Sequence, residues 1–483
     1  MRVQFINALL GGDFSALDIG ITQLATIVNL SEKHKAAILD LTFHTKDWKK
    51  HLHKEIRKFK PEIIGMATNT MYMQYVKRIA REIKEHYDIP IVVGGYHASI
   101  HPKDTVELKD IDYVFVGDAE YSLMQFLDNY ETKKGLKQIG GLWYVDKKKN
   151  EIHSNNQGCF IKDLDSWPVP DWNLWEDLDK YFYYLGMLYV IGSRGCPYRC
   201  TYCDAVGIAK AVKGPYFRLR DPEKYAQELA LLWEKYKPRG VRLAQIFDEV
   251  FTFSPKWVKD FSKAYRESTD VRAHGYSTFA RIDNLDKERL EILGKSGCKL
   301  LRVGIEAGNN YIRQEIYQKK ISTPQIKKIF KLAKANGIDF TAFYILGGPA
   351  ETKKTINQTI NMARKLNAAR SAFFIYKPFT KEGMDQIIQH GGHVDKARWA
   401  KADNITFNAV VRLKDVSPTQ VEWLQRKAYF LTFGKRLLKM IATDKHEYFT
   451  NFATYMTRGI KDGLDWRYLV PYYHIYGYKW VDK

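Results

Sequence analysis

Three cysteines in one short segment constrain this chain more than any other feature of its sequence. Cys196, Cys200 and Cys203 are three of only five cysteines among 483 residues. The apolar run from Met187 to Gly192 that precedes them is typical of a buried strand. We therefore expect the three thiols on a loop that leaves a strand. Thiolates hold iron–sulfur clusters, and a four-iron cluster normally takes four of them, so three leave one iron open to a small molecule.

Two other interpretations of the cysteines remain: a zinc knuckle and reduced structural thiols. Structural zinc prefers four ligands, usually as two close pairs of Cys or His. No second pair accompanies this loop. We therefore predict that Cys196, Cys200 and Cys203 bind a [4Fe-4S] cluster.

The cysteine spacing, with Tyr202 directly before the last cysteine, resembles the signature of the radical S-adenosylmethionine enzymes. In that family the open iron chelates the amino and carboxylate groups of S-adenosylmethionine, and one-electron cleavage gives a 5′-deoxyadenosyl radical. The resemblance implies that Tyr202 lies at the cofactor site. It also implies an electron donor such as flavodoxin or ferredoxin.

The composition, 45% hydrophobic and 27% charged residues, is ordinary for a globular protein. No apolar run reaches the roughly 20 residues that span a bilayer, and the first residues are too briefly apolar for a signal peptide. Few, clustered cysteines argue against a disulfide framework, so we expect a cytoplasmic protein. The net charge of +21 comes from scattered lysines, including Lys319 and Lys320, which usually mark a solvated surface. An anionic substrate or surface is the alternative.

Residues 1–135 alternate short apolar runs with amphipathic stretches, which predicts an α/β domain with a doubly wound parallel sheet. Predicted strands begin near Val3, Ala36, Ile63, Ile91 and Tyr113. In such sheets ligands lie at the carboxyl ends of the strands.

Small and polar residues follow three of these strands: Thr68, Asn69, Thr70, Gly94, Gly95 and Gly117. They resemble the strand ends of the cobalamin-binding domain that precedes many radical S-adenosylmethionine enzymes, and the resemblance implies that they bind cobalamin. The Asp-x-His-x-x-Gly motif, which supplies a lower cobalt ligand in many such domains, is absent, so no axial ligand is assigned. We expect His97 to make a structural hydrogen bond rather than bind cobalt. A domain that packs but binds nothing is the alternative.

Residues 136–185 are predicted to be a linker with a hairpin, followed by a proline-punctuated extended stretch. The main domain boundary is placed here. From residue 186 to 385 the strand–helix alternation resumes, and about six units predict a partial (β/α)6 barrel with its chemistry at the carboxyl ends of the strands.

The radical family resemblance implies roles for several strand-end residues of this barrel. Asp248 and Glu249 meet the amino group of S-adenosylmethionine, since a carboxylate suits an ammonium. Arg281, which follows the strand that carries Ser277, pairs with the cofactor's carboxylate. A helix cap for Asp248 and a structural ion pair for Arg281 are the alternatives.

Two more positions carry the resemblance. Glu306 matches a polar position near the ribose, and Gly347 matches a turn beside the adenine. The last strand departs from the family, because Pro378 is followed by Phe-Thr where relatives often continue Gly-Thr. This departure concerns the substrate side of the site.

Residues 386–483 are predicted to be mainly helical and rich in aromatic side chains, with an amphipathic helix from Val421 to Ile441. The tail from Trp466 to Trp480 suits packing over the barrel mouth, or stacking on bases or lipid headgroups. Cys159 and Cys298 are interpreted as ordinary thiols.

Together these resemblances imply a cobalamin-dependent methyltransferase that acts on an unactivated carbon or phosphorus of a small molecule or lipid. One alternative is a radical cyclisation or rearrangement without methyl transfer, and another is a non-catalytic cobalamin-binding protein. A third is a nucleic-acid modifier similar to the methylthiotransferases, which carry a second cysteine trio. Residues 1–158 contain no cysteine, so we expect no nucleic-acid substrate.

Overall fold

The computed structural model of the chain describes residues 1–473 except 12, 16, 133–134, 147–148, 150, 156–157, 403–405, 444, 467–468 and 471–472, and it describes residues 435–448 by their backbone alone. The chain divides into two compact units. The first comprises Met1–Leu185, Gly207–Arg218 and the segment that begins at Thr454. The second comprises Gly186–Val206 and Leu219–Ala453.

The first unit is built on a seven-stranded sheet with the order β2-β1-β3-β4-β5-β6-β7. The strands are β1 (Arg2–Asn7), β2 (Lys35–Asp40), β3 (Ile63–Ala67), β4 (Ile91–Gly94), β5 (Tyr113–Phe115), β6 (Leu142–Asp146) and β7 (Glu151–Ser154). β1 to β5 run parallel, and β6 and β7 form an antiparallel hairpin that extends the sheet beside β5. The doubly wound α/β fold predicted from the sequence is therefore correct.

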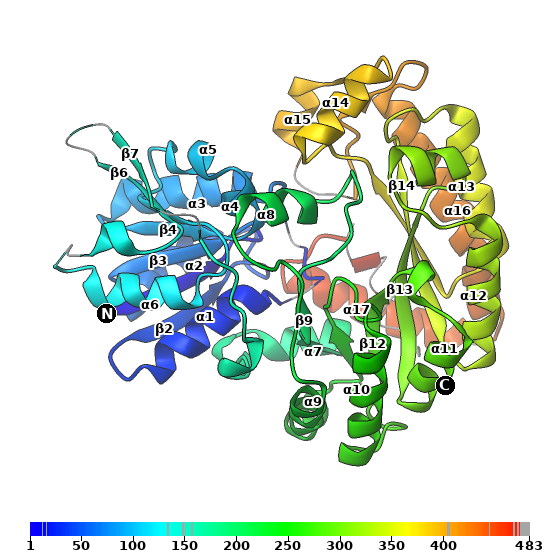
Figure 1. The fold of residues 1–483 in the computed structure, drawn as a ribbon, viewed down its shortest axis with the longest axis horizontal. Helices are drawn as coiled ribbons and strands as arrows, with labels where there is room; N and C mark the ends of the chain where they lie inside the picture. The colour runs from blue at the N-terminus through cyan, green and yellow to red at the C-terminus, as the bar shows by residue number, and fades with distance from the viewer. Residues whose placement is uncertain are drawn as a thin grey trace. The chain divides into compact units, whose positions relative to one another are not determined.

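Helices cover both faces of this sheet (Figure 1). The helices of this unit up to residue 185 are α1 (Ile19–Leu30), α2 (Trp48–Phe59), α3 (Met73–His86), α4 (Tyr96–Ile100), α5 (Pro102–Val106), α6 (Glu120–Asn129) and α7 (Leu178–Leu185). One apolar core joins α2 and α3 to the strands, because Leu52 and Ile79 are buried against residues such as Ile64. Burial of this kind gives about 25 cal/mol for each Å² of apolar surface, which holds the strand ends at one fixed edge.

The second unit is built on six parallel strands in the order β15-β14-β13-β12-β11-β8. They are β8 (Met187–Val190), β11 (Leu243–Ile246), β12 (Tyr276–Ala280), β13 (Cys298–Glu306), β14 (Asp339–Leu346) and β15 (Arg370–Ile375). The sheet curls, and Figure 1 shows the intervening helices along its outer side. This is the predicted partial barrel of six strands.

The helices of this unit begin at clear sequence signals. They are α9 (Pro222–Tyr236), α10 (Pro255–Ser268), α11 (Lys287–Lys295), α12 (Thr323–Ala335) and α13 (Lys353–Leu366). Asp221, Ser254 and Ser322 each accept hydrogen bonds from the first turn of the helix that follows, and a proline stands at the first or second position of each of those helices. Both features favour a helix start.

The C-terminal region is mainly helical, as predicted: α14 (Lys381–Gln389), α15 (Lys396–Lys401), α16 (Pro418–Thr443) and α17 (Lys445–Lys461). The remaining α-helix is α8 (Ala205–Ala211), and the short strands are β9 (Ser193–Arg194), β10 (Arg218–Leu219), β16 (His393–Val394) and β17 (Val411–Arg412). Among the described residues, no helix combines the length and hydropathy required to cross a membrane.

Some features of the structure differ from what the sequence predicted, and some predictions fall on residues that the structure does not describe. The hairpin assigned to the linker belongs to the first sheet, and the linker ends in α7, which the sequence analysis did not predict. Lys319 is not a surface lysine, since only 5% of it is exposed. The aromatic tail from residue 474 onward lies outside the described residues, and the predicted domain limits stay predictions.

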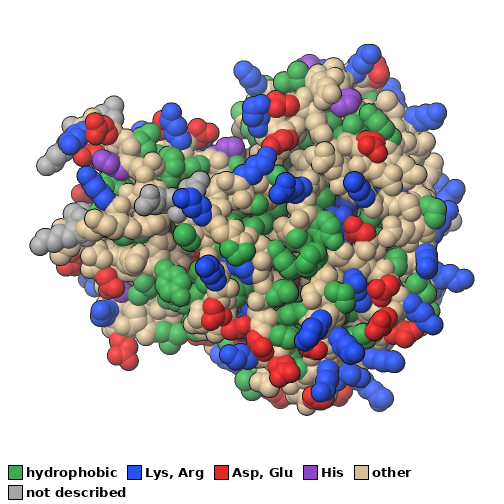
Figure 2. Space-filling model, in the orientation of Figure 1, with side chains coloured by type: hydrophobic (Ala, Val, Ile, Leu, Met, Phe, Trp, Pro, Cys, Tyr) green, Lys and Arg blue, Asp and Glu red, His purple; other side chains and the backbone are tan. Residues whose placement is uncertain are grey.

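Figure 2 shows other Lys and Arg side chains spread over the face in view among Asp and Glu.

Candidate functional site

The three cysteines lie on the loop that leaves β8. Cys200 is buried, Cys196 and Cys203 are half-buried, and none of them forms a disulfide. Burial raises the pKa of the Cys203 thiol to about 12, and burial likewise raises the pKa of Cys196. The neighbouring cysteines raise the pKa of each of these two thiols further, so the thiols lie near enough to one another to interact electrostatically. Such a site disfavours free thiolates and suits a metal centre, whose positive charge deprotonates the thiols it binds.

The cysteine loop is anchored by residues far along the chain. The Thr201 hydroxyl donates to the carbonyl oxygen of Ile316 at 2.7 Å, and the Thr380 hydroxyl donates to the carbonyl oxygen of Thr201 at 3.3 Å. Within the loop, the Cys203 backbone N–H donates to the Cys200 carbonyl at 3.1 Å. These bonds fix the loop conformation before any cofactor binds.

Tyr202 and Glu306, both predicted cofactor residues, contact each other directly beside a buried lysine. The Tyr202 hydroxyl donates to Glu306 Oε1 at 2.9 Å, and Lys319 Nζ lies 2.8 Å from the same oxygen. The side chains of Lys319 and Glu306 are 6% and 7% exposed. Tyr202, the aromatic residue of the cysteine motif, is therefore held at the end of β13 next to a buried ion pair.

The two carboxylates after β11 contact the backbone just before the cysteines. Asp248 accepts from the Gly192 backbone N–H at 2.7 Å, and Glu249 accepts from the Gly195 backbone N–H at 3.1 Å. Complete burial raises the pKa of Asp248 to about 7. The expected contact with an ammonium group stays a prediction, and in this structure both side chains hold the loop.

Arg281 lies against the cluster loop itself. Its Nη1 donates to Cys200 Sγ at 3.3 Å, while its Nε and Nη2 donate to the two oxygens of Asp283 at 3.0 and 2.8 Å. Ser277, the other predicted residue on this strand, donates to Gln245 Oε1 at 2.5 Å and is fully buried.

Gly347 begins a turn that is closed by Glu351. Its φ of +81° lies in the left-handed region that glycine tolerates. Glu351 accepts from the backbone N–H groups of Gly347 and Gly348 at 2.7 and 3.2 Å, and burial raises its pKa to about 8. The proximity of this turn to adenine stays a prediction.

In the first unit, the ends of β3 and β4 lie together. The backbone N–H of His97 donates to the Thr68 carbonyl at 3.1 Å, and the His97 ring nitrogen Nδ1 lies 3.2 Å from Thr70 Oγ1. Burial lowers the pKa of His97 to about 4. The structural hydrogen bond expected for His97 is therefore present, and its partner is one of the predicted cobalamin residues.

The glycines at this edge differ in their surroundings. A Cβ built on Gly94 meets no atom within 4 Å, whereas one on Gly95, at φ +91°, lies 2.8 Å from the Thr68 backbone. A Cβ on Gly117 lies 3.0 Å from Val212. Gly94 therefore faces open space that a ligand can fill, and Gly95 and Gly117 are glycine for close packing. Asn69 accepts from the backbone N–H groups of the next turn.

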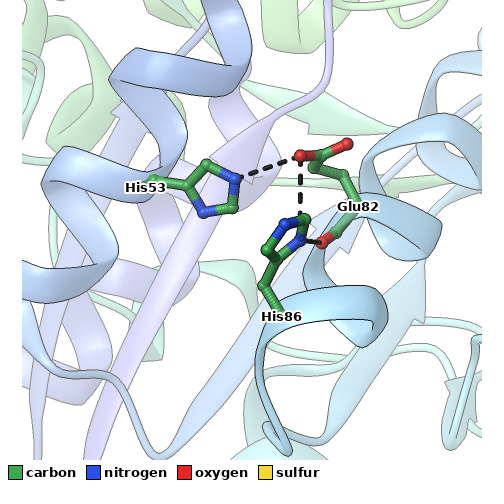
Figure 3. A group of neighbouring side chains, drawn as sticks. All are labelled: His53, Glu82 and His86. Carbon is green, nitrogen blue, oxygen red and sulfur yellow. Dashed lines mark hydrogen bonds and ion pairs between the residues drawn. The ribbon is translucent and has the colours of Figure 1, made fainter.

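One further group of possible metal ligands among the described residues, outside the cysteine loop, is His53, Glu82 and His86. Figure 3 shows His53 of α2 pointing toward Glu82 and His86 of α3. His53 Nε2 lies 3.0 Å from Glu82 Oε1, and the Lys49 ammonium contacts the other carboxylate oxygen. His86 Nδ1 is 2.9 Å from the Glu82 carbonyl. With a lysine cation already on the carboxylate, this group is an ion-pair network between two helices.

The sequence analysis missed Lys319, Asp283 and Glu351. For Glu351 a local signal exists, since a carboxylate four residues after a glycine pair can cap the turn. Lys319 is one of two adjacent lysines, and this pattern favoured a position on the solvated surface rather than a buried one. No signal in the sequence paired Arg281 with the sulfur of Cys200.

Two family profiles match the chain. The one described as the radical SAM superfamily matches residues 190–363, and the one described as the B12 binding domain matches residues 7–127. The first range contains the cysteine loop and Arg281, and the second contains the strand ends around Gly94.

Curated relatives include a protein of Pyrococcus horikoshii described as an uncharacterized methyltransferase. It is 28% identical over 438 residues, which cover 88% of this chain and 89% of that protein. The anaerobic magnesium-protoporphyrin IX monomethyl ester cyclase of Cereibacter sphaeroides is 25% identical over 352 residues, covering 71% of this chain and 55% of the cyclase. This chain thus matches just over half of the cyclase's length.

Among solved structures, the radical S-adenosylmethionine methyltransferase TsrM from Kitasatospora setae, with tryptophan and a cofactor analog bound, has the same fold. The TM-score is 0.68 at 18% sequence identity, and the match covers 90% of this chain and 89% of TsrM.

The chain thus joins a B12-binding domain to a curled parallel sheet whose first strand is followed by a loop with three free cysteines. The chain belongs to the radical S-adenosylmethionine enzymes that carry a cobalamin-binding domain. Its cofactors are a [4Fe-4S] cluster, S-adenosylmethionine and cobalamin.

Replacing Cys200 tests the cluster ligands. We expect Cys200→Ala to lose most cluster iron and all formation of 5′-deoxyadenosine, because two thiolates remain for a cluster that needs three from the protein. Iron per chain and chromatography of the nucleoside products measure both. Cys159→Ala, at the exposed cysteine, is the matched control and should keep both. Cleavage by Cys200→Ala at the rate of the wild type would contradict the assignment.

Lys319 and its neighbour Lys320 give a second test. Lys319→Met leaves the Glu306 carboxylate buried without its cation, which costs about 3–5 kcal/mol of unfolding free energy. Lys320 is exposed, so Lys320→Met should change it by less than about 0.5 kcal/mol. Denaturant titration measures both values. Adding Glu306→Gln to Lys319→Met should recover part of the loss, and equal stability of the two lysine variants would contradict the buried ion pair.

Proposed function

We propose that this protein transfers a methyl group to an unactivated carbon or phosphorus of a small molecule. One observation carries the proposal: a single chain joins a B12-binding domain to a radical S-adenosylmethionine domain whose three cysteines lie on one anchored loop. The relative described as a methyltransferase, which matches this chain over nearly its whole length, supports it.

The bound cofactors supply the reactive groups, namely a 5′-deoxyadenosyl radical from S-adenosylmethionine and the cluster, and a methyl group from methylcobalamin. The protein's part is binding, orientation and exclusion of water. Cys196, Cys200 and Cys203 would hold three irons, and Tyr202, fixed by Glu306 and Lys319, would lie beside the cofactor they bind. Asp248 and Glu249, which hold the glycines before the first cysteine, would set the position of that loop.

On the cobalamin side, Thr68, Asn69, Thr70, Gly94 and Gly95 would line the ligand. The open space at Gly94 supports this assignment. Gly117 would shape the same edge through its packing rather than by contact. No residue is proposed as a lower cobalt ligand, because His97 already engages Thr70.

A second candidate function is cyclisation or rearrangement without methyl transfer. The similarity to the magnesium-protoporphyrin monomethyl ester cyclase favours it. The proposal also retains three predictions from the sequence: a lipid as one kind of substrate, flavodoxin or ferredoxin as electron donor, and a cytoplasmic location.

Isotope transfer separates the two functions. The protein is reconstituted anaerobically with iron, sulfide and hydroxocobalamin, so that the only methyl source is S-adenosylmethionine, then incubated with a reductant, methyl-deuterated S-adenosylmethionine and the small-molecule fraction of a cell extract. Methyl transfer predicts a product that gains one deuterated methyl group, detected by mass spectrometry. Formation of 5′-deoxyadenosine and of a product with no deuterium would contradict methyl transfer and favour rearrangement.

Gly94 tests the cobalamin site. Gly94→Val places a side chain in the open space without a clash, so we expect an intact fold with cobalamin affinity lowered at least about tenfold, or 1.4 kcal/mol. Gly140 has equally open surroundings, and Gly140→Val is the matched control. Bound cobalamin per chain, measured by absorbance, checks the result. Unchanged binding in Gly94→Val would remove this strand end from the site.

A further inference from the structure

The Arg281 side chain is held in one orientation by two neighbours. Asp283 accepts from its Nε and Nη2, and the Tyr198 ring centre lies 3.6 Å from the guanidinium carbon. Tyr198 is fixed in turn, since its hydroxyl donates to Asn284 Oδ1 at 2.5 Å. Only 7% of Arg281 is exposed. A planar guanidinium clamped on one edge by a carboxylate and on one face by a ring presents its remaining edge in a fixed direction.

That remaining edge faces a sulfur. Nη1 of Arg281 donates to Cys200 Sγ at 3.3 Å, and both atoms are buried. The residue that carries the donor lies 81 positions from the cysteine, so the contact comes from the fold and not from the local loop. The nitrogens that the family resemblance assigns to the carboxylate of S-adenosylmethionine are engaged by Asp283 and Cys200.

A hydrogen bond to a cysteine sulfur changes the electron affinity of an iron–sulfur cluster. Hydrogen bonds to the sulfurs, net charge and burial set the reduction potential of such clusters. The N–H donor and the positive end of the Arg281–Asp283 pair stabilise the more negative, reduced state. Asp283 limits this effect, because its carboxylate neutralises most of the guanidinium charge.

We propose that Arg281 is a positioning residue that raises the reduction potential of the cluster through Cys200, and that Asp283 sets the size of this effect. The inference rests on the proposed function in one respect, the binding of the cluster by Cys200. It assigns Arg281 to electron transfer into the cluster rather than to recognition of the carboxylate of S-adenosylmethionine.

The test is a redox titration of the reconstituted cluster, followed by electron paramagnetic resonance, without S-adenosylmethionine or substrate. Arg281→Gln removes the charge, and we expect about a tenfold lower ratio of reduced to oxidised cluster at a fixed potential, which is a shift of about 59 mV to more negative values for one electron. Asp283→Asn leaves the guanidinium charge uncompensated, so its cluster should shift in the opposite direction. Arg281→Lys keeps the charge and should fall between wild type and Arg281→Gln.

A nearby arginine provides the control. Arg289 donates to the backbone carbonyls of Thr252 and Asn284, and Arg289→Gln should leave the potential within error of wild type. Iron per chain, measured for every variant, separates a shifted potential from a lost cluster. If Arg281→Gln assembles no cluster, Asp283→Asn and Arg281→Lys test the inference instead, because their reduction potentials should shift in opposite directions.

The outcomes are distinct. Equal potentials in wild type, Arg281→Gln and Asp283→Asn at full iron content overturn the inference and leave the proposed function standing. An unchanged potential with weaker binding of S-adenosylmethionine in Arg281→Gln also overturns it and returns the residue to the cofactor carboxylate. A wild-type protein that assembles no cluster overturns the proposed function and this inference together.

Discussion

Around one short loop, charged side chains are removed from water and balanced by partners within hydrogen-bond distance. Glu306 is balanced by Lys319, and Arg281 by Asp283. Removing ions from water costs several kcal/mol each, and the cost is offset only when geometry is good and the remaining donors and acceptors are satisfied. These pairs therefore permit few alternative arrangements of the side chains around the cysteine loop. Because the loop contacts them, it is held in one conformation.

The local structure of β13 shows how this balance is built. The strand has a register shift between Gly304 and Glu306, and Glu306 adopts a φ of +65°. A Cβ on Gly304 would lie 1.9 Å from Glu306 Oε1 and 2.5 Å from Lys319 Nζ. A side chain at position 304 would therefore displace the ion pair beside it. The Gly-Ile-Glu sequence of this strand has a physical explanation that does not depend on the ribose contact implied by the family.

Both units are built on parallel strands, and in both the predicted cofactor residues lie at the carboxyl ends of these strands. In the first unit, Thr68 lies beside Gly94, which faces open space, and Thr70 contacts His97. In the second unit, the loop after β8 collects the three thiols. Such edges gather residues from several chain segments, so a site built there combines groups that no single segment contains. This is why two cofactor sites can share one chain of ordinary composition.

The sequence by itself determined the two sheets, their order along the chain and the place of the three cysteines on the loop after β8, because alternating apolar runs and cysteine spacing are local signals. The family resemblance, in addition, assigned Tyr202, Arg281 and Glu306 to one cofactor site, and this assignment stays a prediction. Only the tertiary structure decided their partners. Tyr202 meets Glu306 across 104 positions, and Arg281 meets Cys200 across 81. Contacts at such separation depend on strand register and burial, which no local sequence pattern records. For the same reason the sequence predicted Lys319 on the surface, whereas the fold buries it against Glu306.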